Sequence, residues 1–400
     1  MVARDSSERH PRLLVLGAGP AQLGLLEAAR ARGLFTIVVD RDPGAPGFAF
    51  ADRRAIVSTE DERGIERLAQ AERIDGVIAP GIDWPVGIAA RVAAKLGIPH
   101  PLEPAAAGLA VSKARQRERL DEAGVPQPRW RLVTGPERGL PLPCVVKAPD
   151  RQGQRGLSVV RDEAELAPAI AAAVEASRTA AALVEELVEG AEVTVNAFSV
   201  DGEFVPLTVT DRFTAEPPAF GVALAHVWPS RADHGAAPKV AGEAVAALGI
   251  GSGPTYTQVR IDTDGPKVME VAARLGGGHD AELCHGAVGV DLNGLALAAA
   301  LGEGVEPPVA VPQVGGATTA FLVAPPGELQ SLNGVDQAER AEGVVAVRVY
   351  RRTGFRFGEL RVGSDRAGAV LAVGDSRDEA YERARSAAAL IRFQTDAALV

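Results

Sequence analysis

Apolar runs alternate with helical segments at the start of the chain. Arg12–Gly24 reads RLLVLGAGPAQLG, an apolar strand that enters a glycine turn, and Ala21–Arg32 continues with helical periodicity. Thr36–Val39 is a second apolar run, and it ends at Asp40. This order of strand, helix and strand predicts the opening of a doubly wound parallel sheet, in which ligands bind near the carboxyl ends of the strands.

The same alternation continues to about residue 100. The pattern predicts strands at 56–57 and 76–79 and helices at 62–70 and 84–96. A Gly-Ile-Pro segment at 97–99 leads out of the last of these helices. We therefore expect a first α/β domain to close near this point.

The rest of the chain mixes helices and short strands. The pattern predicts helices at 105–124, 163–177, 236–248 and 287–300, and strands at 143–148, 157–160, 181–186, 193–200, 204–209 and 221–227. The last two strands flank a loop at 211–220. A final section of short strands begins at 313–323, contains an apolar strand at 366–372 and ends in an alanine-rich helix at 376–393.

A hairpin is predicted between these regions. Thr255–Ile261 alternates and is rich in β-formers, a Thr-Asp-Gly turn follows at 263–265, and Lys267–Val271 returns. Pairing across that turn places Gln258 opposite Glu270. Arg274 and three glycines come next. Oxygen ligands suit Mg²⁺, which otherwise takes waters and phosphates, and an arginine beside it can hold a carboxylate or a phosphate.

Composition narrows the possible partners. A chain of 400 residues suggests two or three domains, and 46% hydrophobic with 24% charged residues is typical of a globular protein. The net charge of −10 argues against broad binding to nucleic acid or anionic membranes. No apolar run approaches a membrane span and Met1–His10 resembles no signal peptide, so we expect a cytoplasmic protein. Cys144 and Cys284 are expected to be buried free thiols.

The first glycine turn allows two readings. The spacing is GxGxxxxG rather than GxGxxG, which weakens a dinucleotide-binding interpretation with Asp40 on a ribose. The structural alternative is that Gly17 and Gly19 form the tight turn and that Gly24 lets the helix pack closely. We favour the structural alternative.

Lysine is rare in this chain, so each lysine is a candidate for a specific role. Only five of the 42 basic residues are lysines. Lys113 lies in a helical run, where a solvated helix face is the simpler reading. Lys147 ends a strand before the loop Asp150–Gly156, whose glycines can expose backbone N–H groups to phosphates. The alternative for this loop is an ordinary hairpin with solvated arginines.

An acidic segment follows the strand at 181–186. A strand that stops at Glu185-Glu186-Leu187-Val188 leaves backbone groups free beside apolar side chains, which suits an adenine edge. Glu192 could accept hydrogen bonds from ribose hydroxyls. The alternative is a solvated acidic patch.

These pieces, in this order, resemble the ATP-grasp superfamily of carboxylate–amine ligases over nearly the whole chain. The resemblance implies phosphate contacts from Lys113 and Lys147 and metal ligation by Gln258 and Glu270. It implies further ATP contacts at Gly153, Arg155, Gly156, Glu185, Glu186, Val188 and Glu192.

The same resemblance implies the fold class and the domains. We expect an α/β protein with a Rossmann-like N-terminal domain over residues 1–108. An α+β ATP-grasp fold follows over 109–310, with a mobile lid at about 130–195. A C-terminal α+β section covers 311–400 and is similar to that of L-amino-acid ligases.

Two departures from the superfamily pattern bear on the metal site. Many members carry an acid where this chain has Gln258, and the usual Glu-x-Asn pair is here Glu270-Val271-Ala272, so the third ligand is missing. The form EVAARLGGGH at 270–279 looks most like the L-amino-acid ligases, and it implies catalytic roles for Arg274 and His279. A structural hydrogen bond is the alternative for His279. The residues after Arg274 argue against biotin carboxylase.

The implied function is an ADP-forming carbon–nitrogen ligase. Such an enzyme activates a small carboxylate as an acyl phosphate and joins it to an amine, as L-amino-acid ligases do with two amino acids. ATP and Mg²⁺, with Mn²⁺ as a substitute, are the implied cofactors, and a homodimer is common among similar proteins. The alternatives are a purine-pathway type carboxylase or ligase and a nucleotide-binding module without ligase activity. An NAD-dependent enzyme built on Gly17–Asp40 is a weaker alternative.

Overall fold

A parallel sheet forms the N-terminal part of the computed structural model, which describes residues 10–135, 137, 141–151, 154–216, 219–233 and 235–396. Its strands β1 (Arg12–Leu16), β2 (Phe35–Asp40), β3 (Arg53–Ile56) and β4 (Gly76–Ile78) lie in the order β3-β2-β1-β4. The helices here are α1 (Leu23–Ala31), α2 (Glu62–Glu72) and α3 (Trp84–Leu96), with 3₁₀ turns η1 (Pro20–Gln22) and η2 (Pro46–Phe50). The predicted α/β opening is confirmed.

The first glycine turn is stabilised from within the chain. Asp40 accepts a hydrogen bond from the Ala18 N–H at 2.9 Å and another from Asp42. Gly17 has a φ of +113°, which a residue with a side chain rarely adopts. Gly24 lies so close to Glu282 that a Cβ there would be 2.3 Å from its Oε1. These contacts favour the structural reading of the glycines.

A small antiparallel sheet forms a separate layer, the lid. Its strands are β5 (Trp130–Val133), β6 (Cys144–Lys147), β7 (Ser158–Val160) and β8 (Ala182–Glu186), in the order β5-β8-β6-β7. Helix α6 (Glu163–Ala176) covers one face, and its residues Leu166, Ile170 and Ala173 share a core with Val146 and Val184. Cys144 is a buried free thiol of this core, as expected.

The largest sheet within the described residues has eight strands, in the order β13-β12-β9-β10-β11-β14-β18-β16. The first five are β9 (Ala191–Val200), β10 (Glu203–Thr214), β11 (Ala223–Trp228), β12 (Gly253–Asp262) and β13 (Gly265–Ala272), and α7 (Ala236–Ala247) packs on them. The others, β14 (Gly316–Leu322), β16 (Val344–Val349) and β18 (Gly368–Gly374), come from the C-terminal section. The C-terminal section therefore continues the central sheet.

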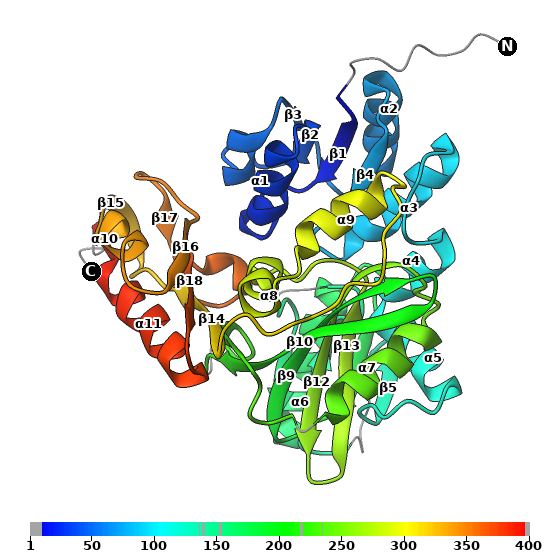
Figure 1. Cartoon of the computed structure of the whole chain (residues 1–400). Helices are drawn as coiled ribbons and strands as arrows, with labels where there is room; N and C mark the ends of the chain where they lie inside the picture. The colour runs from blue at the N-terminus through cyan, green and yellow to red at the C-terminus, as the bar shows by residue number, and fades with distance from the viewer. Residues whose placement is uncertain are drawn as a thin grey trace, which may run out of the picture.

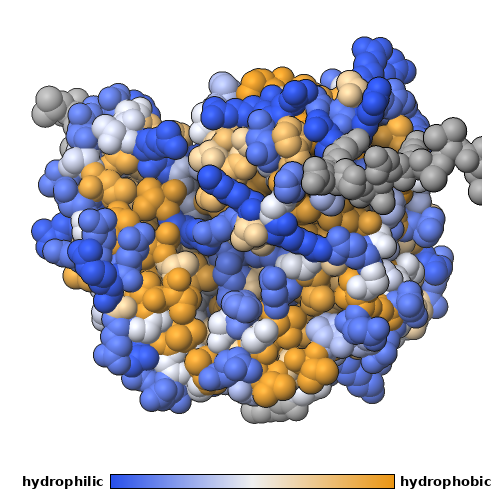
Figure 2. Space-filling view, turned by 45° about the horizontal axis from the view of Figure 1, so that its top comes forward, coloured by the Kyte–Doolittle hydropathy of each residue, from blue (hydrophilic) through white to orange (hydrophobic). Residues whose placement is uncertain are grey.

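The remaining elements complete two further layers. Helices α8 (Asp280–Val288) and α9 (Leu292–Ala300) lie between the N-terminal domain and the large sheet (Figure 1). The C-terminal lobe adds β15 (Gly327–Asn333), α10 (Val335–Glu339), β17 (Arg356–Phe357), η3 (Gly363–Asp365), α11 (Arg377–Leu390) and β19 (Arg392–Asp396). On the face drawn in Figure 2, a notch separates the upper end of this lobe from the rest of the molecule.

Three predicted elements are wrong in ways that matter. The run at 105–124 is two helices, α4 (Pro104–Ala110) and α5 (Lys113–Glu122), because Ser112 has extended backbone and caps α5. The run at 287–300 likewise breaks at Gly289, which has a left-handed conformation. Asp211 belongs to strand β10 rather than to a loop. It is buried, and it accepts hydrogen bonds from Ser230 and Arg377.

The helices of the described residues also bear on the membrane question. None of them is both long enough and apolar enough to cross a bilayer.

Gly316 provides a test of the packing between β14 and α11. A Cβ at this buried glycine would lie 2.5 Å from the Arg377 Cα and the Ser376 carbonyl oxygen, which are backbone atoms that cannot rotate away. We expect Gly316→Ala to lower the free energy of unfolding by about 2 kcal/mol, as overpacked sites do. Gly304→Ala is the control, because nothing lies within 4 Å of its Cβ position. Equal denaturation midpoints for both variants would contradict the packing.

Candidate functional site

A cavity of about 180 Å³ lies between the lid and the large sheet. Most of the predicted site residues meet there, including Lys113, Lys147, Gln258 and Glu270. The lining also includes the apolar side chains of Val145, Leu157, Leu187, Val188 and Met269. A cavity lined by both apolar side chains and lysines has the features that a nucleotide requires.

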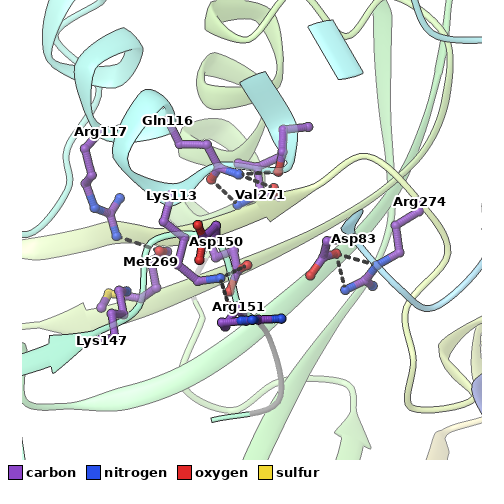
Figure 3. A network of polar contacts seen from close by, with 12 residues as sticks. Asp83, Lys113, Gln116, Arg117, Lys147, Asp150, Arg151, Met269, Val271 and Arg274 are labelled. Atoms are coloured by element: carbon purple, nitrogen blue, oxygen red, sulfur yellow. Dashed lines mark hydrogen bonds and ion pairs between the residues drawn. The ribbon is translucent and has the colours of Figure 1, made fainter. Parts of the chain in front are cut away.

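Lys113 is placed by the first turn of α5. Its Nζ lies 2.7 Å from Glu270 Oε1 and donates to the Arg151 carbonyl oxygen at 2.8 Å (Figure 3). The side chain is 12% exposed, so the solvated-face reading of Lys113 is wrong. The split of the predicted helix explains the difference, because Ser112 starts a new helix and turns Lys113 toward the sheet.

Glu270 faces Gln258 across the predicted hairpin. The two residues are direct partners in the antiparallel register of β12 and β13, which confirms this pairing. Burial by itself would raise the pKa of Glu270, but Lys113, Lys147 and Arg274 together outweigh it and the net pKa is lowered. The carboxylate is therefore ionised at neutral pH and can act as an oxygen ligand.

Glu185 is the most deeply buried of the predicted acids. It is 1% exposed, and Arg117 Nε and Lys147 Nζ each lie 2.7 Å from one of its oxygens. Burial would raise the pKa of Glu185, but Arg117 and Lys147 together lower it to about 2. Arg117 also donates to the carbonyl oxygens of Val268 and Met269 on β13. The reading of Glu185 as part of a solvated patch is therefore wrong.

The other acids of the acidic segment are held by arginines. Glu186 pairs with Arg129 at 2.6 Å, at the end of strand β8. Glu192 lines the cavity, and Arg212 and Arg260 each contact one of its oxygens. These arginines outweigh the effect of burial and lower the pKa of Glu192. A ribose contact from Glu192 stays a prediction.

The predicted phosphate loop is described in part. Gly153 lies outside the described residues. Arg155 is exposed and lines the cavity. Gly156 has a φ of +69°, and a Cβ there would lie 2.7 Å from that of Ala176, so glycine is required by packing on α6.

Arg274 comes two residues after the end of β13. It lines the first cavity and also a second cavity, which is described below. Its Nη2 lies 2.7 Å from Asp83 Oδ1, and its guanidinium carbon lies 5.4 Å from the ring centroid of Tyr256. Figure 3 shows this pair beside the Lys113 group. Asp83 comes from the N-terminal domain, and sequence reasoning missed it because no local motif marks it. Ala272, at the place of the missing metal ligand, is 3% exposed.

His279 packs against the C-terminal lobe. Its Nδ1 lies 3.0 Å from Glu282 Oε1, its Nε2 lies 2.6 Å from the Tyr350 hydroxyl, and the residue is 4% exposed. Its φ of +59° also shows a backbone fixed by its surroundings. Both ring nitrogens are engaged, which fits the structural alternative for His279. Its catalytic role stays a prediction.

The second cavity has a volume of about 380 Å³ and adjoins the first. Five residues line both cavities, and they are Gln154, Arg155, Arg212, Gln258 and Arg274. Its remaining walls come from the glycine turn of the N-terminal domain, from β11 and from the C-terminal lobe. The three parts of the chain thus meet around one space.

Sequence reasoning missed a histidine that lines this second cavity. His226 is 2% exposed, and its Nδ1 lies 2.9 Å from Oδ1 of the fully buried Asp280. Its buried Nε2 has no hydrogen-bond partner among the described residues. Burial would raise the pKa of Asp280, but His226, the Gly278 N–H and Arg274 together lower it to about 2. The only local signal is a histidine in the apolar strand ALAHVW.

Comparison with known families agrees with this arrangement. Residues 140–282 match the ATP-grasp domain, and residues 320–396 match the L-amino acid ligase C-terminal domain 2. An uncharacterized protein, y4rH, of Sinorhizobium fredii is 28% identical over 375 residues, which are 89% of this chain and 77% of that protein. The formate-dependent phosphoribosylglycinamide formyltransferase of Burkholderia pseudomallei is 28% identical over 166 residues, 40% of this chain and 41% of that enzyme.

The fold also matches solved structures. The crystal structure of the L-amino acid ligase from Bacillus licheniformis superposes with a TM-score of 0.82 at 22% identity, over 98% of this chain and 100% of that one. At this identity the likeness establishes the fold. Together with the two matched domains it confirms the expected architecture, and ATP with Mg²⁺ is what this fold uses. The chain therefore contains an ATP-grasp domain within residues 140–282 and, within residues 320–396, the C-terminal domain 2 of the L-amino acid ligases.

Proposed function

We propose that this protein is an ADP-forming ligase that activates a small carboxylate as an acyl phosphate and joins it to an amine, with two amino acids as the first candidate pair. The observation that carries this proposal is the direct connection of the two cavities through Arg274 and Gln258. The first cavity offers the features of a nucleotide site. The second lies beside it, where a carboxylate can reach the terminal phosphate.

The first cavity supports ATP binding through its two kinds of wall. The apolar side chains around Val188 and Met269 can sandwich a purine ring. Lys113 and Lys147 supply charge for the phosphates, and the carboxylates of Glu270 and Glu185 hold their ammonium groups in place. Gln258, Glu270 and Arg155 lie in the same cavity. The roles of all these residues are part of the proposal.

The oxygen donors at the hairpin fit a magnesium ion with few protein ligands. The described residues contain no cluster of three or more His, Cys, Asp or Glu side chains that could hold a metal ion by themselves. The Gln258 amide and the Glu270 carboxylate would hold Mg²⁺ together with phosphate oxygens and water. When bound, the ion would neutralise charge on the transferred phosphoryl group.

The reaction proposed has two steps. A carboxylate oxygen of the acid attacks the γ-phosphorus, the bond to the bridging oxygen breaks, and ADP leaves with that electron pair. The amine nitrogen then attacks the acyl carbon, and inorganic phosphate leaves. Arg274 lies where it can stabilise both the acyl phosphate and the oxyanion. The amine must lose a proton for the amide to form.

His226 is the best-placed acceptor for that proton. His226 lines the second cavity, and with its Nδ1–H donated to Asp280 its Nε2 would be the basic nitrogen, which has no described hydrogen-bond partner. His279 has no such free nitrogen. We therefore assign proton transfer to His226 in this scheme.

A purine-pathway type ligase is the second candidate. The matched stretch of the formyltransferase supports it. A nucleotide-binding module without ligase activity is supported by the buried Ala272, which cannot ligate a metal. The expected homodimer and domain boundaries stay predictions.

Product formation tests the proposal. ADP and phosphate release from ATP and Mg²⁺ should be measured with L-amino acids singly and in pairs, and products identified by mass. We expect release that depends on an acid and an amine together, with a condensed product. Release that needs a purine-pathway acid or bicarbonate would favour the second candidate. ATP binding without release in any mixture would contradict ligase activity.

Glu270→Gln tests the metal assignment. The variant keeps the size of the side chain but removes its charge, so we expect ADP release to fall at least about 100-fold, as for loss of charge stabilisation in phosphoryl transfer. The exposed Glu243→Gln on α7 is the control and should keep full activity. Both variants should melt within a few degrees of the wild type. Wild-type turnover in Glu270→Gln would refute the assignment.

His226→Asn tests the proton acceptor. We expect ligation to fall about 100-fold or more, the usual effect of losing a general base, while hydroxylamine still traps the acyl phosphate as a hydroxamate. Hydroxylamine needs no protein base at neutral pH because it is already unprotonated. Hydroxamate formation and ligation are measured on the same preparation. Equal loss of both would show that His226 is structural, and unchanged ligation would exclude it as the base.

A further inference from the structure

The second cavity is rich in cations. Its described lining contains four arginines and no aspartate or glutamate. Two of them are already paired, Arg212 with Glu192 and Arg274 with Asp83. Arg155 is exposed to solvent. Arg366, from the C-terminal lobe, is the partly buried arginine that remains.

Arg366 is held in place by neutral groups. Its Nε donates to the Gly363 carbonyl oxygen at 2.8 Å, and its Nη1 donates to the Ala223 carbonyl oxygen at 3.4 Å. Its guanidinium carbon lies 3.7 Å from the ring centroid of Phe321. No described carboxylate forms an ion pair with it, and its Nη2 donates to no described residue. The guanidinium is therefore positioned without a counterion.

This arrangement is electrostatically unfavourable without an anion. Burial lowers the pKa of Arg366 by more than the Tyr350 phenol raises it, and Arg212 lowers it further. A guanidinium removed from water needs a partner of opposite charge to recover its lost solvation. Because Arg366 lines the second cavity, an anion bound there would supply that partner.

Arg274 and Arg366 occupy different positions in the second cavity, and these positions suit different roles. Arg274 lines both cavities, so it lies beside the place where the reacting carboxylate meets the nucleotide. Arg366 lines the second cavity alone, on the side of the C-terminal lobe. The second cavity, which Arg366 borders, therefore adjoins the place proposed for the reacting carboxylate.

We propose that the acid substrate is a dicarboxylate, whose second carboxylate is bound by Arg366, with the Ser364 side of the cavity beside it. Arg366 is then a specificity-determining residue rather than a catalytic one. A planar guanidinium suits a carboxylate because it can donate two parallel hydrogen bonds. This inference rests on the proposed ligase function, since it names the class of acid for the same site.

Matched acids in the hydroxylamine assay test the charge preference. L-Glutamate is compared with L-glutamine and succinate with succinamate, because each pair differs in charge and little in shape. Hydroxylamine replaces the unidentified amine. We expect wild-type kcat/KM to be at least about tenfold higher for the acid with two carboxylates in each pair, the effect of leaving a site's charged group unpaired. Equal or higher values for the acid with one carboxylate would overturn the proposal.

Three variants separate specificity from stability. Arg366→Met should bring the ratio of kcat/KM between paired acids to about one, with an unchanged KM for ATP, and Arg366→Lys should keep most of the preference. Arg361→Met is the control, because Arg361 is exposed and pairs with Glu359 in the same segment. If Arg366 only supported the fold, Arg366→Met would lower the melting temperature and leave the ratio intact. That result would overturn the assignment.

A binding measurement keeps this inference separate from the proposed function. Calorimetry should show succinate binding to the wild type in the presence of ATP and Mg²⁺, and at least tenfold weaker binding to Arg366→Met. If no acid yields hydroxamate while this difference holds, the ligase proposal fails and the anion site stands. If phosphonoacetate bound more tightly than malonate, the site would prefer a phosphoryl group, and the assignment of a second carboxylate would be wrong. No difference between wild type and variant would refute the site.

Discussion

The buried ion pair network around Glu185 is the interaction on which the rest of the site depends. Glu185 sits at the end of a lid strand, and two cations from different elements neutralise it. One of them, Arg117, also donates to two carbonyl oxygens of β13, the strand that carries Glu270. A buried carboxylate cannot lose either partner without a large cost. Through Arg117, the end of lid strand β8 is therefore connected to hairpin strand β13, and the ion pair with Glu185 holds the Lys147 side chain in place.

Ion pairs between a cation and a carboxylate also occur around both cavities. Lys113 is held by Glu270, Arg274 by Asp83 and Arg212 by Glu192. Each pair holds a cation at a cavity wall while reducing the cost of its burial. A nucleotide with its metal would compete for these partners, so the site can exchange internal ion pairs for contacts with substrate. Arg366 differs because no described carboxylate forms an ion pair with it, and its proposed role in selecting the acid rests on this difference.

Local features of the chain were predictable because they depend on neighbouring residues. The hairpin and its register follow from alternation around one turn, so the pairing of Gln258 with Glu270 could be predicted. Lys147 was found because a strand ends beside a glycine loop. The burial of Lys113 could not be predicted from periodicity, since a single cap at Ser112 changes the direction in which it points. Asp83 and His226 carry no motif, and they reach the site only when distant segments pack together.

Short-range pattern and spacing were enough to predict the parallel N-terminal sheet, the hairpin that pairs Gln258 with Glu270 and the resemblance to the ATP-grasp ligases. Which histidine lines the second cavity depends instead on how distant segments pack. The sequence indicated only His279 as a base, but packing against Tyr350 and Glu282 engages both of its ring nitrogens. His226 was missed, and its Nε2 has no hydrogen-bond partner among the described residues because Asp280 contacts only Nδ1. Tertiary packing also determines which carboxylate pairs with each arginine. These ion pairs join segments that are distant in the sequence, so they depend on how separate layers pack and not on neighbouring residues.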